Sequence, residues 1–422
     1  MAVGVRPKLP ESTPRAGRRL ALPATFSSLR HRNYRLLWTG TLISSSGDWM
    51  DQIALNWLMY TVTNSPVYLG LLNFCRLAPI LVFTLIGGVV ADRVERRRLM
   101  FTTQSVAMVL ALVLATLVST GMVQVWMVLL IAAGRGVMLS FNMPARQSLI
   151  SELVPAEDLM NAIALNSATL NLTRVIGPAI GGGLIATVGV AGAFYLNAAS
   201  FLAVLYGLAM MRFPERPPKR RKAGILTELA GGIRYLRGQP ALRTVVILAL
   251  LPMVFGMPYM TMLTVFARDV LKVGGGGLGL LTACSGAGAM LGALTVASLR
   301  GARRRGRLML AGLVGFGLAL LLFSASPWLW LSLPALMAVG ASQQVYNATN
   351  NTLIQVYVDE EYRGRVTSTL FLNRGMVPLG TLMAGFGTAA FGPQITMGAM
   401  AAVLIAMALL AMRFAPAARD LE

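Results

Sequence analysis

Two carboxylates, Asp48 and Asp51, are the residues of this chain best suited to proton chemistry, because they alone among its acidic residues fall inside the long apolar runs. Gln52 and Asn56 follow Asp48 at four and eight positions, so a helix would carry all four polar groups on about one face. An ionisable group at membrane depth is costly unless it has a function or a partner. The polar stripe is therefore predicted to face a central cavity rather than lipid.

Three roles are open for Asp48: a proton-coupling carboxylate, a structural hydrogen-bonding group or a counter-ion for the substrate. Asp51 is a candidate to share a proton with it, because two neighbouring carboxylates in a poorly solvated site do not ionise easily together. The alternative is that Arg135 or Arg76, both inside apolar runs, neutralises one of them. The single histidine, His31, lies in the basic tail, so no histidine is available for an intramembrane proton relay.

The elements that must position these residues are membrane-spanning helices. The chain of 422 residues is 56% hydrophobic and only 13% charged, whereas soluble proteins carry about 25% charged residues. Apolar runs of roughly 18 to 25 residues indicate helices, since barrel strands would be about 10 residues long and alternate in polarity. The twelve predicted spans are 36–60, 67–91, 99–120, 125–144, 163–188, 190–211, 244–266, 277–299, 308–325, 328–350, 367–390 and 395–415.

The net charge of +21 reports topology rather than nucleic-acid binding. With a cytoplasmic amino terminus, most of the 37 lysines and arginines lie on the cytoplasmic side, and the opposite side keeps only Arg268 and Lys272. This is the positive-inside asymmetry. It predicts that both termini are cytoplasmic, and a bacterial-type inner membrane is the expected location.

The spans divide into two halves joined by a polar linker. Arg174 with Pro178 recurs 200 positions later as Arg374 with Pro378, at the corresponding place in each half, which indicates an internal duplication. Parallel six-helix halves with a substrate held between them are a transporter design. The predicted domains are a basic tail over 1–35, a six-helix half over 36–211, a linker with an amphipathic helix over 212–243, a second six-helix half over 244–415 and a tail over 416–422.

The stretch GVVADRVERRR at 88–98 resembles the signature loop of the major facilitator superfamily, G-x-x-x-D-R/K-x-G-R/K-R/K. Glu95 stands in the place of the second glycine of this signature. The resemblance implies a charge-and-dipole latch between the halves. The alternative is that the arginines only enforce topology. The residues implied in this gating loop are Gly88, Asp92, Arg93, Arg96 and Arg97.

A second element, Gly177-Pro178-Ala179-Ile180-Gly181-Gly182, is similar to the fifth-helix motif of proton antiporters. Pro178 removes a backbone hydrogen bond, and Gly177, Gly181 and Gly182 permit close helix approach, so a bendable packed interface is predicted. The alternative is an ordinary kinked packing helix. Along its length the chain resembles the drug:proton antiporter branch that holds macrolide-efflux proteins and the enterobactin exporter, for example at FSSLR over 26–30 and PARQ over 144–147.

These observations predict a twelve-helix major facilitator transporter that exports a small amphipathic compound, drug-like or siderophore-like, in exchange for protons by alternating access. Four intramembrane arginines (Arg76, Arg135, Arg174, Arg374) against two aspartates favour anionic or zwitterionic cargo. For Arg174 and Arg374 the alternative is a structural role across the interface. The alternative function is an uncoupled facilitator or lipid flippase, and from another class a membrane receptor or scaffold. No enzyme motif, cofactor site or metal site is indicated; a monomer in contact with lipid, protons and a small molecule is expected.

Overall fold

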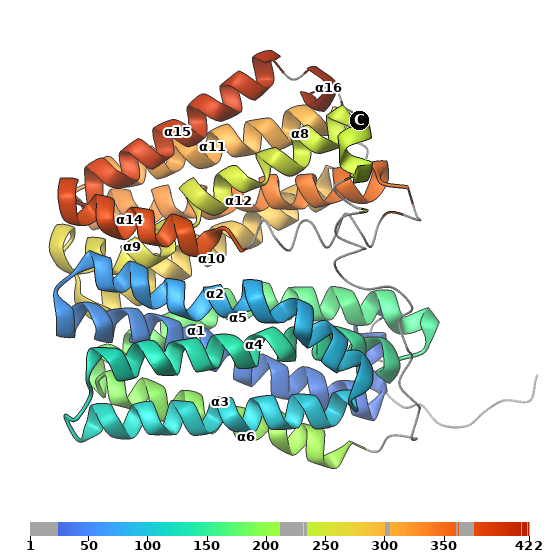
Figure 1. Ribbon diagram of the computed structural model, residues 1–422, viewed down its shortest axis with the longest axis vertical. Helices are drawn as coiled ribbons and strands as arrows, with labels where there is room; N and C mark the ends of the chain where they lie inside the picture. The colour runs from blue at the N-terminus through green and yellow to red at the C-terminus, as the bar shows by residue number, and fades with distance from the viewer. Residues whose placement is uncertain are drawn as a thin grey trace, which may run out of the picture.

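The predicted apolar runs fold into long helices that lie side by side (Figure 1). A computed structural model of the chain describes residues 24–211, 231, 234–299, 304–359, 362, 375–414, 416–419 and 421. The predicted amphipathic helix of the linker falls largely outside these residues.

The first bundle is built from six helices preceded by a short turn of helix. Asn64 takes a left-handed conformation, with φ of 49°, that ends the first helix, and Pro66 opens the second with its fixed φ. The elements are η1 (Ala24–Arg30), α1 (Arg32–Thr63), α2 (Pro66–Arg93), α3 (Arg96–Ser119), α4 (Val125–Leu153), α5 (Ala156–Thr187) and α6 (Val190–Met210).

The second bundle begins with a helical rod over 240–270 that is interrupted twice by wider turns. Pro252 and Pro258 lack the N–H that an α-helix needs, and the Met257 N–H instead reaches back five residues to the Pro252 carbonyl, at 2.7 Å. The elements are α8 (Pro240–Leu248), η2 (Pro252–Gly256), α9 (Tyr259–Val265), η3 (Phe266–Val270), α10 (Gly274–Ser298), α11 (Arg305–Ala325), α12 (Leu329–Tyr357), α14 (Val377–Phe391), α15 (Pro393–Phe414) and α16 (Pro416–Arg419).

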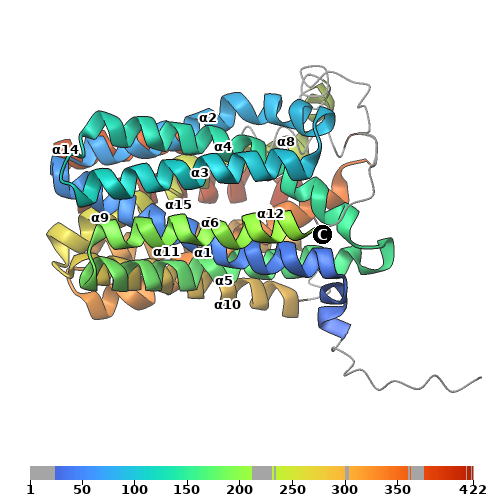
Figure 2. The same ribbon diagram turned by 90° about the horizontal axis from the view of Figure 1, so that it is seen from below.

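The long helices of both bundles run between two faces of the molecule (Figures 1 and 2). The termini-bearing face holds η1, the start of α1 and α16. The opposite face holds short turns that use positive φ, at Asn64, Gly121, Gly189, Lys272 and Gly392. Such turns reverse the chain within a few residues, so neighbouring helices pack antiparallel.

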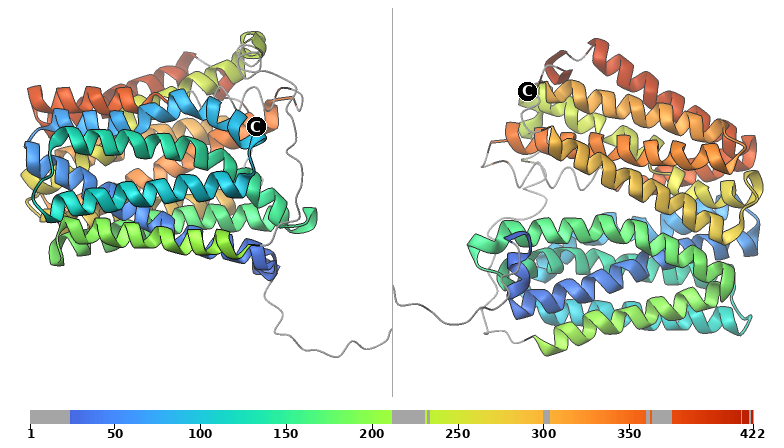
Figure 3. Two further views of the ribbon diagram at one scale, coloured as in Figure 1. Left: turned by 60° about the horizontal axis from the view of Figure 1, so that its bottom comes forward. Right: turned by 180° about the vertical axis from the view of Figure 1, so that it is seen from behind.

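The two bundles meet along two helix pairs, α5 with α10 and α2 with α14 (Figure 3). Glycines bring these backbones together: a Cβ atom at Gly182 would lie 2.6 Å from the Gly279 Cα, and one at Gly385 would lie 2.7 Å from the Pro66 carbonyl oxygen. Both approaches lie in the parts of the helices nearer the opposite face. Where the structure describes both bundles, their close contacts therefore gather toward that face.

The described helices follow the twelve predicted spans in order, and α1, α4, α5 and α12 extend beyond their predicted bounds at the termini-bearing face. The part of the eleventh span over 367–374 lies outside the described residues. Within the described part of the chain, eight helical segments are long and apolar enough to cross a membrane, and α14 is a shorter apolar helix. Helices α1, α5 and α12 are as long but more polar, because they carry interior groups such as Asp51, Arg174 and Gln343. On the outside, large apolar side chains are exposed, among them Leu130 and Leu202, as a lipid-facing surface requires.

Candidate functional site

Asp51 is completely buried and paired with Arg135. One guanidinium nitrogen of Arg135, Nη1, contacts Asp51 Oδ2, and the Asn197 side-chain amide donates to Asp51 Oδ1 at 3.1 Å. Gly47 makes this possible, since a Cβ there would lie 2.5 Å from Asn197 Oδ1. Helix α6 can therefore approach α1 closely enough to bond the carboxylate.

Asp48 has a different environment, although it shares the same arginine. Its Oδ1 lies 3.6 Å from Arg135 Nη2, and 45% of its side-chain surface is accessible, against 9% for Arg135. Arg135 thus lies between a buried carboxylate and an accessible one. Of the alternatives predicted from the sequence, the structure has Arg135 as the residue that neutralises Asp51.

Arg76 contributes charge to this cluster without an ion pair to any described residue. Its guanidinium interacts electrostatically with Arg135, Asp51 and Asp48. Its backbone carbonyl packs against Gly136, where any side chain would clash with it. Arg76 and Arg135 are therefore held near each other by the α2–α4 contact.

Two small pockets lie on either side of this part of α1. The N-half pocket is formed by helices of the first bundle alone, α1, α3 and α4, and is lined by Thr41, Ser44, Ser45, Asp48, Gln104, Leu139, Asn142, Met143 and Arg146. The interface pocket lies between the bundles and is lined by Trp49, Gln52, Ile53, Asn56, Met260, Thr264, Leu278 and Thr282. The two pockets share no lining residue.

The structure divides the predicted polar stripe of α1 among different surroundings. Asp51 faces α6, Asp48 lines the N-half pocket, and Gln52 and Asn56 line the interface pocket. The reason is geometric: successive residues turn by about 100° around a helix, so Asp51 lies roughly 60° from Asp48. The stripe reaches three environments rather than one cavity.

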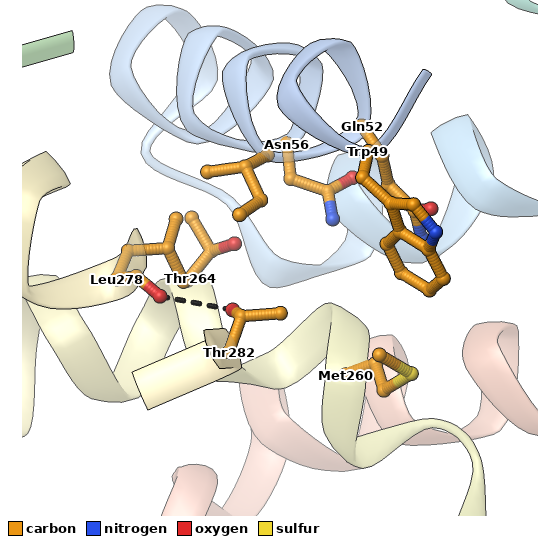
Figure 4. Close-up of a pocket in the computed structure, with 8 residues that line it drawn as sticks. Trp49, Gln52, Asn56, Met260, Thr264, Leu278 and Thr282 are labelled. Carbon is orange, nitrogen blue, oxygen red and sulfur yellow. Dashed lines mark hydrogen bonds between the residues drawn. The ribbon is translucent and has the colours of Figure 1, made fainter. Parts of the chain in front are cut away.

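The interface pocket combines polar and apolar groups from both bundles (Figure 4). Trp49, Gln52 and Asn56 come from α1 and face Met260 of α9 and Thr282 of α10. The Asn56 side chain is held by α2, because the Asn73 amide donates to Asn56 Oδ1 at 3.0 Å. The lining therefore combines an indole, a thioether and aliphatic side chains with amide and hydroxyl groups.

Arg174 bridges the two bundles. Its Nη2 donates to Gln343 Oε1 at 2.8 Å and lies 3.5 Å from the Tyr259 hydroxyl, while its Nε is buried without a hydrogen-bond partner among the described residues. Arg174 therefore lies across the interface between the bundles, as the alternative of a structural role expects. Arg374 lies outside the described residues, and Pro378 is buried in the first turn of α14.

The glycine motif of α5 packs against two helices. Cβ atoms at Gly177 and Gly181 would lie 2.5 Å from the Trp49 Cβ and 2.9 Å from the Met50 Cα of α1. Gly182 faces α10, and a Cβ at Gly279 would lie 2.6 Å from the Pro178 carbonyl oxygen. The motif thus joins the cavity-lining α1 to the second bundle.

The signature-like loop is described only in part, since the side chains of Gly88, Asp92 and Arg93 lie outside the described set. Glu95 has φ of −56°, so this turn does not require glycine. Arg96 pairs with Glu152 of α4, and Arg97 Nε donates to the Leu208 carbonyl at the end of α6 at 2.7 Å. Arginine at a helix carboxyl end is favourable for the helix dipole.

Several contacts were not predicted from the sequence. At the opposite face the Tyr60 hydroxyl donates to the Asp269 carboxylate, and Arg268 Nη1 donates to the Tyr60 carbonyl at 2.8 Å. The presence of Arg268 on a nearly uncharged side was the available signal. No role was predicted for Arg146, which lines the N-half pocket and lies in the PARQ sequence over 144–147.

At the termini-bearing face, the segment before α1 is fastened to α5. Ser27 Oγ donates to Asp158 at 2.6 Å, His31 Nε2 lies 2.7 Å from the same carboxylate, and Ser28 Oγ donates to Asn161 at 2.7 Å. The hydrogen bonds from Ser27 and His31 hold the pKa of Asp158 below its usual range. This fastening gives the FSSLR motif a structural role.

The comparisons with known proteins agree with this architecture. The family model described as transmembrane secretion effector matches residues 23–421. The staphyloferrin A transporter of Staphylococcus aureus (strain NCTC 8325 / PS 47) is 28% identical in an alignment over 362 residues that covers 82% of this chain and 87% of the relative. The enterobactin exporter EntS of Escherichia coli O1:K1 / APEC is 28% identical over 341 residues, 80% of each chain.

Solved structures share the fold at low sequence identity. A bacterial homologue of the human lysosomal transporter Spinster, inward-facing and unoccupied, has a TM-score of 0.74 at 16% identity over 93% of this chain and 98% of its own. The nucleoside transporter NupG has a TM-score of 0.71 at 15% identity over 90% of this chain and 98% of its own. The predicted all-α, two-half membrane fold is confirmed. The chain belongs to the transmembrane secretion effector family of the major facilitator superfamily, and is a multi-pass membrane transporter rather than an enzyme.

Proposed function

We propose that this transporter exports a small amphipathic compound of the siderophore type in exchange for protons, by alternating access. The names of the relatives support the cargo class, since two of them are described as a staphyloferrin A transporter and an enterobactin exporter. The interior charge supports anionic or zwitterionic cargo. Asp51 and Arg135 neutralise each other. The interior then keeps one further carboxylate, Asp48, and three further cations, Arg76, Arg146 and Arg174.

One observation carries the proton-coupling part: Arg135 is shared between a buried carboxylate and an accessible one. Ionised Asp48 attracts Arg135, whereas protonated Asp48 leaves Arg135 to Asp51. Because Asp48 lies on α1 and Arg135 on α4, a proton changes the attraction between these two helices. A carboxylate that is accessible and beside a cation is what a reversible proton site requires.

Alternating access is supported by the way the bundles meet. Their close approaches lie toward the opposite face, and the interface pocket lies between them. If the protein lies in a bacterial-type inner membrane with both termini in the cytoplasm, the two bundles are closed toward the outside of the cell. The cargo would then reach the interface pocket from the cytoplasmic side of a monomer.

Proteoliposome transport tests the proposal. Purified protein is reconstituted, a pH gradient is imposed, and the movement of metal-free staphyloferrin A and of enterobactin is measured against protein-free vesicles. We expect at least one probe to move, faster with the gradient than after an ionophore has collapsed it. Transport that is identical with and without the gradient would instead favour the uncoupled facilitator, and movement of neither probe would exclude these two cargoes.

A further inference from the structure

The N-half pocket has no assigned role, and its walls are unusually polar for the inside of one helix bundle. Thr41, Ser44 and Asp48 line it from α1, Gln104 from α3 and Arg146 from α4. Every lining residue belongs to the first bundle, so the pocket does not open or close simply because the bundles rock against each other. A cavity for cargo, in contrast, would need both bundles.

A buried polar atom in this pocket lacks a protein partner. Ser44 is 3% exposed, and its Oγ has no hydrogen-bond partner among the described residues. An unsatisfied buried hydroxyl is costly, so an ordered water is the natural partner. The pocket volume of about 40 Å³ leaves room for more than one water molecule, since one needs only about 10–15 Å³.

The pocket extends from Asp48 toward the termini-bearing face. Thr41, Gln104 and Arg146 lie in the halves of α1, α3 and α4 that are nearer that face. The interface pocket lies on the other side, where Gln52 follows Asp48 by one turn toward the opposite face. Asp48 is therefore positioned between the two.

The charges around Asp48 favour water over a metal cation. Arg135 and Arg146 of α4, Arg76 of α2 and Asp51 of α1 are the charged groups that act on it. Three cations against one further carboxylate would repel a bound metal ion. The arginines disfavour an excess proton on the pocket water as well, so the proton resides on the Asp48 carboxylate and only passes along the hydrogen-bonded water and hydroxyl groups.

We propose that the N-half pocket holds a chain of water molecules that conducts protons between Asp48 and the solution at the termini-bearing face, separately from the cargo route through the interface pocket. This inference rests on the proposed proton exchange at Asp48. The proton leaves a hydronium ion of the water chain and forms an O–H bond on the Asp48 carboxylate, and the reverse step returns it to water; no bond between heavy atoms changes. The two routes then share no lining residue, and α1, which contributes to the walls of both pockets, connects them.

Infrared spectroscopy on the full-length protein tests the route without any cargo. The carboxyl C=O band that appears on acidification and is absent in Asp48→Asn reports protonated Asp48, and its shift after a switch to D₂O reports proton access. The variant Thr41→Val/Ser44→Ala/Gln104→Leu makes the walls apolar at nearly constant size. We expect it to slow the shift by roughly tenfold or more, while the matched variant Thr39→Val/Ser46→Ala/Thr102→Leu, on other faces of the same helices, keeps the parental rate.

Hydroxyl-radical footprinting provides the second readout. Met143 lines the pocket, so bound water should promote its oxidation in the parent and less so in the apolar-wall variant, whereas Met50, 3% exposed on another face of α1, should stay protected in both. An Asp48 band with unchanged D₂O access in the apolar-wall variant, or an unoxidised Met143, overturns the water route alone. If acidification produces no C=O band that Asp48→Asn lacks, proton exchange at Asp48 is overturned, and with it this inference.

Discussion

Tyr60 and Asp269 join the two bundles at the opposite face, where the Tyr60 hydroxyl donates to the Asp269 carboxylate. The guanidinium of the adjacent Arg268 lies 5.2 Å from the centre of the Tyr60 ring and donates to the Tyr60 carbonyl at 2.8 Å. The end of α1 is thereby fastened to η3, a stretch of wider helical turns. A fastening of this kind stabilises the state in which the opposite face is closed.

Replacing Tyr60 by Phe should favour opening of that face, because the hydroxyl is lost while the ring remains. Coupling energies of this kind are about 1–3 kcal/mol, or roughly 5- to 150-fold in the ratio of the two states. Spin labels at Met122 and Trp328, exposed residues of the two bundles at this face, would measure the distance distribution. Tyr68→Phe on exposed α2 surface is the control, and an unchanged distribution in Tyr60→Phe would show that the contact is incidental.

Asp51→Asn should destabilise the protein more than Asp48→Asn does. It leaves buried Arg135 without its main counter-charge, and breaking a buried ion pair costs about 3–5 kcal/mol, whereas Asp48 is partly accessible and farther from Arg135. Thermal unfolding in detergent would rank the two variants. Equal melting temperatures would mean that Asp51 does not anchor Arg135.

Gly182→Ala should impair transport, because the added methyl group would lie 2.6 Å from the Gly279 backbone and push α5 away from α10. The neighbouring Gly183 offers a matched control, since a Cβ there has no atom within 4 Å. Turnover in proteoliposomes should fall for Gly182→Ala and stay near the parental value for Gly183→Ala. Similar turnover in both variants would mean that the α5–α10 approach adapts freely.

The fastening of the amino-terminal segment should depend on pH through Asp158. Because the folded protein lowers the pKa of this carboxyl, the contribution to stability is present above the unfolded value, about pH 4, and is lost as pH falls through the lower folded value. Asp158→Asn should remove this acid-dependent part of the unfolding profile. Glu157→Gln, at the preceding and exposed position, should keep the parental pH dependence. Loss of the acid-dependent part in both variants would show that the contacts of Asp158 are not its source.

The fold was predictable because lipid imposes simple demands on a sequence. The long apolar runs, the loop at 88–98 and the α5 glycine motif were sufficient to predict a fold of two six-helix halves. Helices α1, α5 and α12 were found although polar groups interrupt them, since their flanking apolar residues fill the membrane length.

The candidate site was predictable only in its membership. Asp48, Asp51 and Arg135 were found because charges inside apolar runs are conspicuous, yet nothing in their spacing says which carboxylate Arg135 holds more closely. That preference depends on Asn197 and Gly47, which lie on helices whose packing is set across the bundle. The contact between Tyr60 and Asp269 spans 209 positions, so local pattern could not indicate it.

Asp48 is the proposed coupling site between protons and transport, and one comparison in proteoliposomes tests this role. Asp48→Asn preserves shape but does not titrate, so gradient-driven movement of the cargo probe should be lost, by roughly 10²-fold or more. Exchange of labelled for unlabelled probe across the membrane, which needs no net proton movement, should persist. Gradient-driven transport at the parental rate in Asp48→Asn would contradict the account.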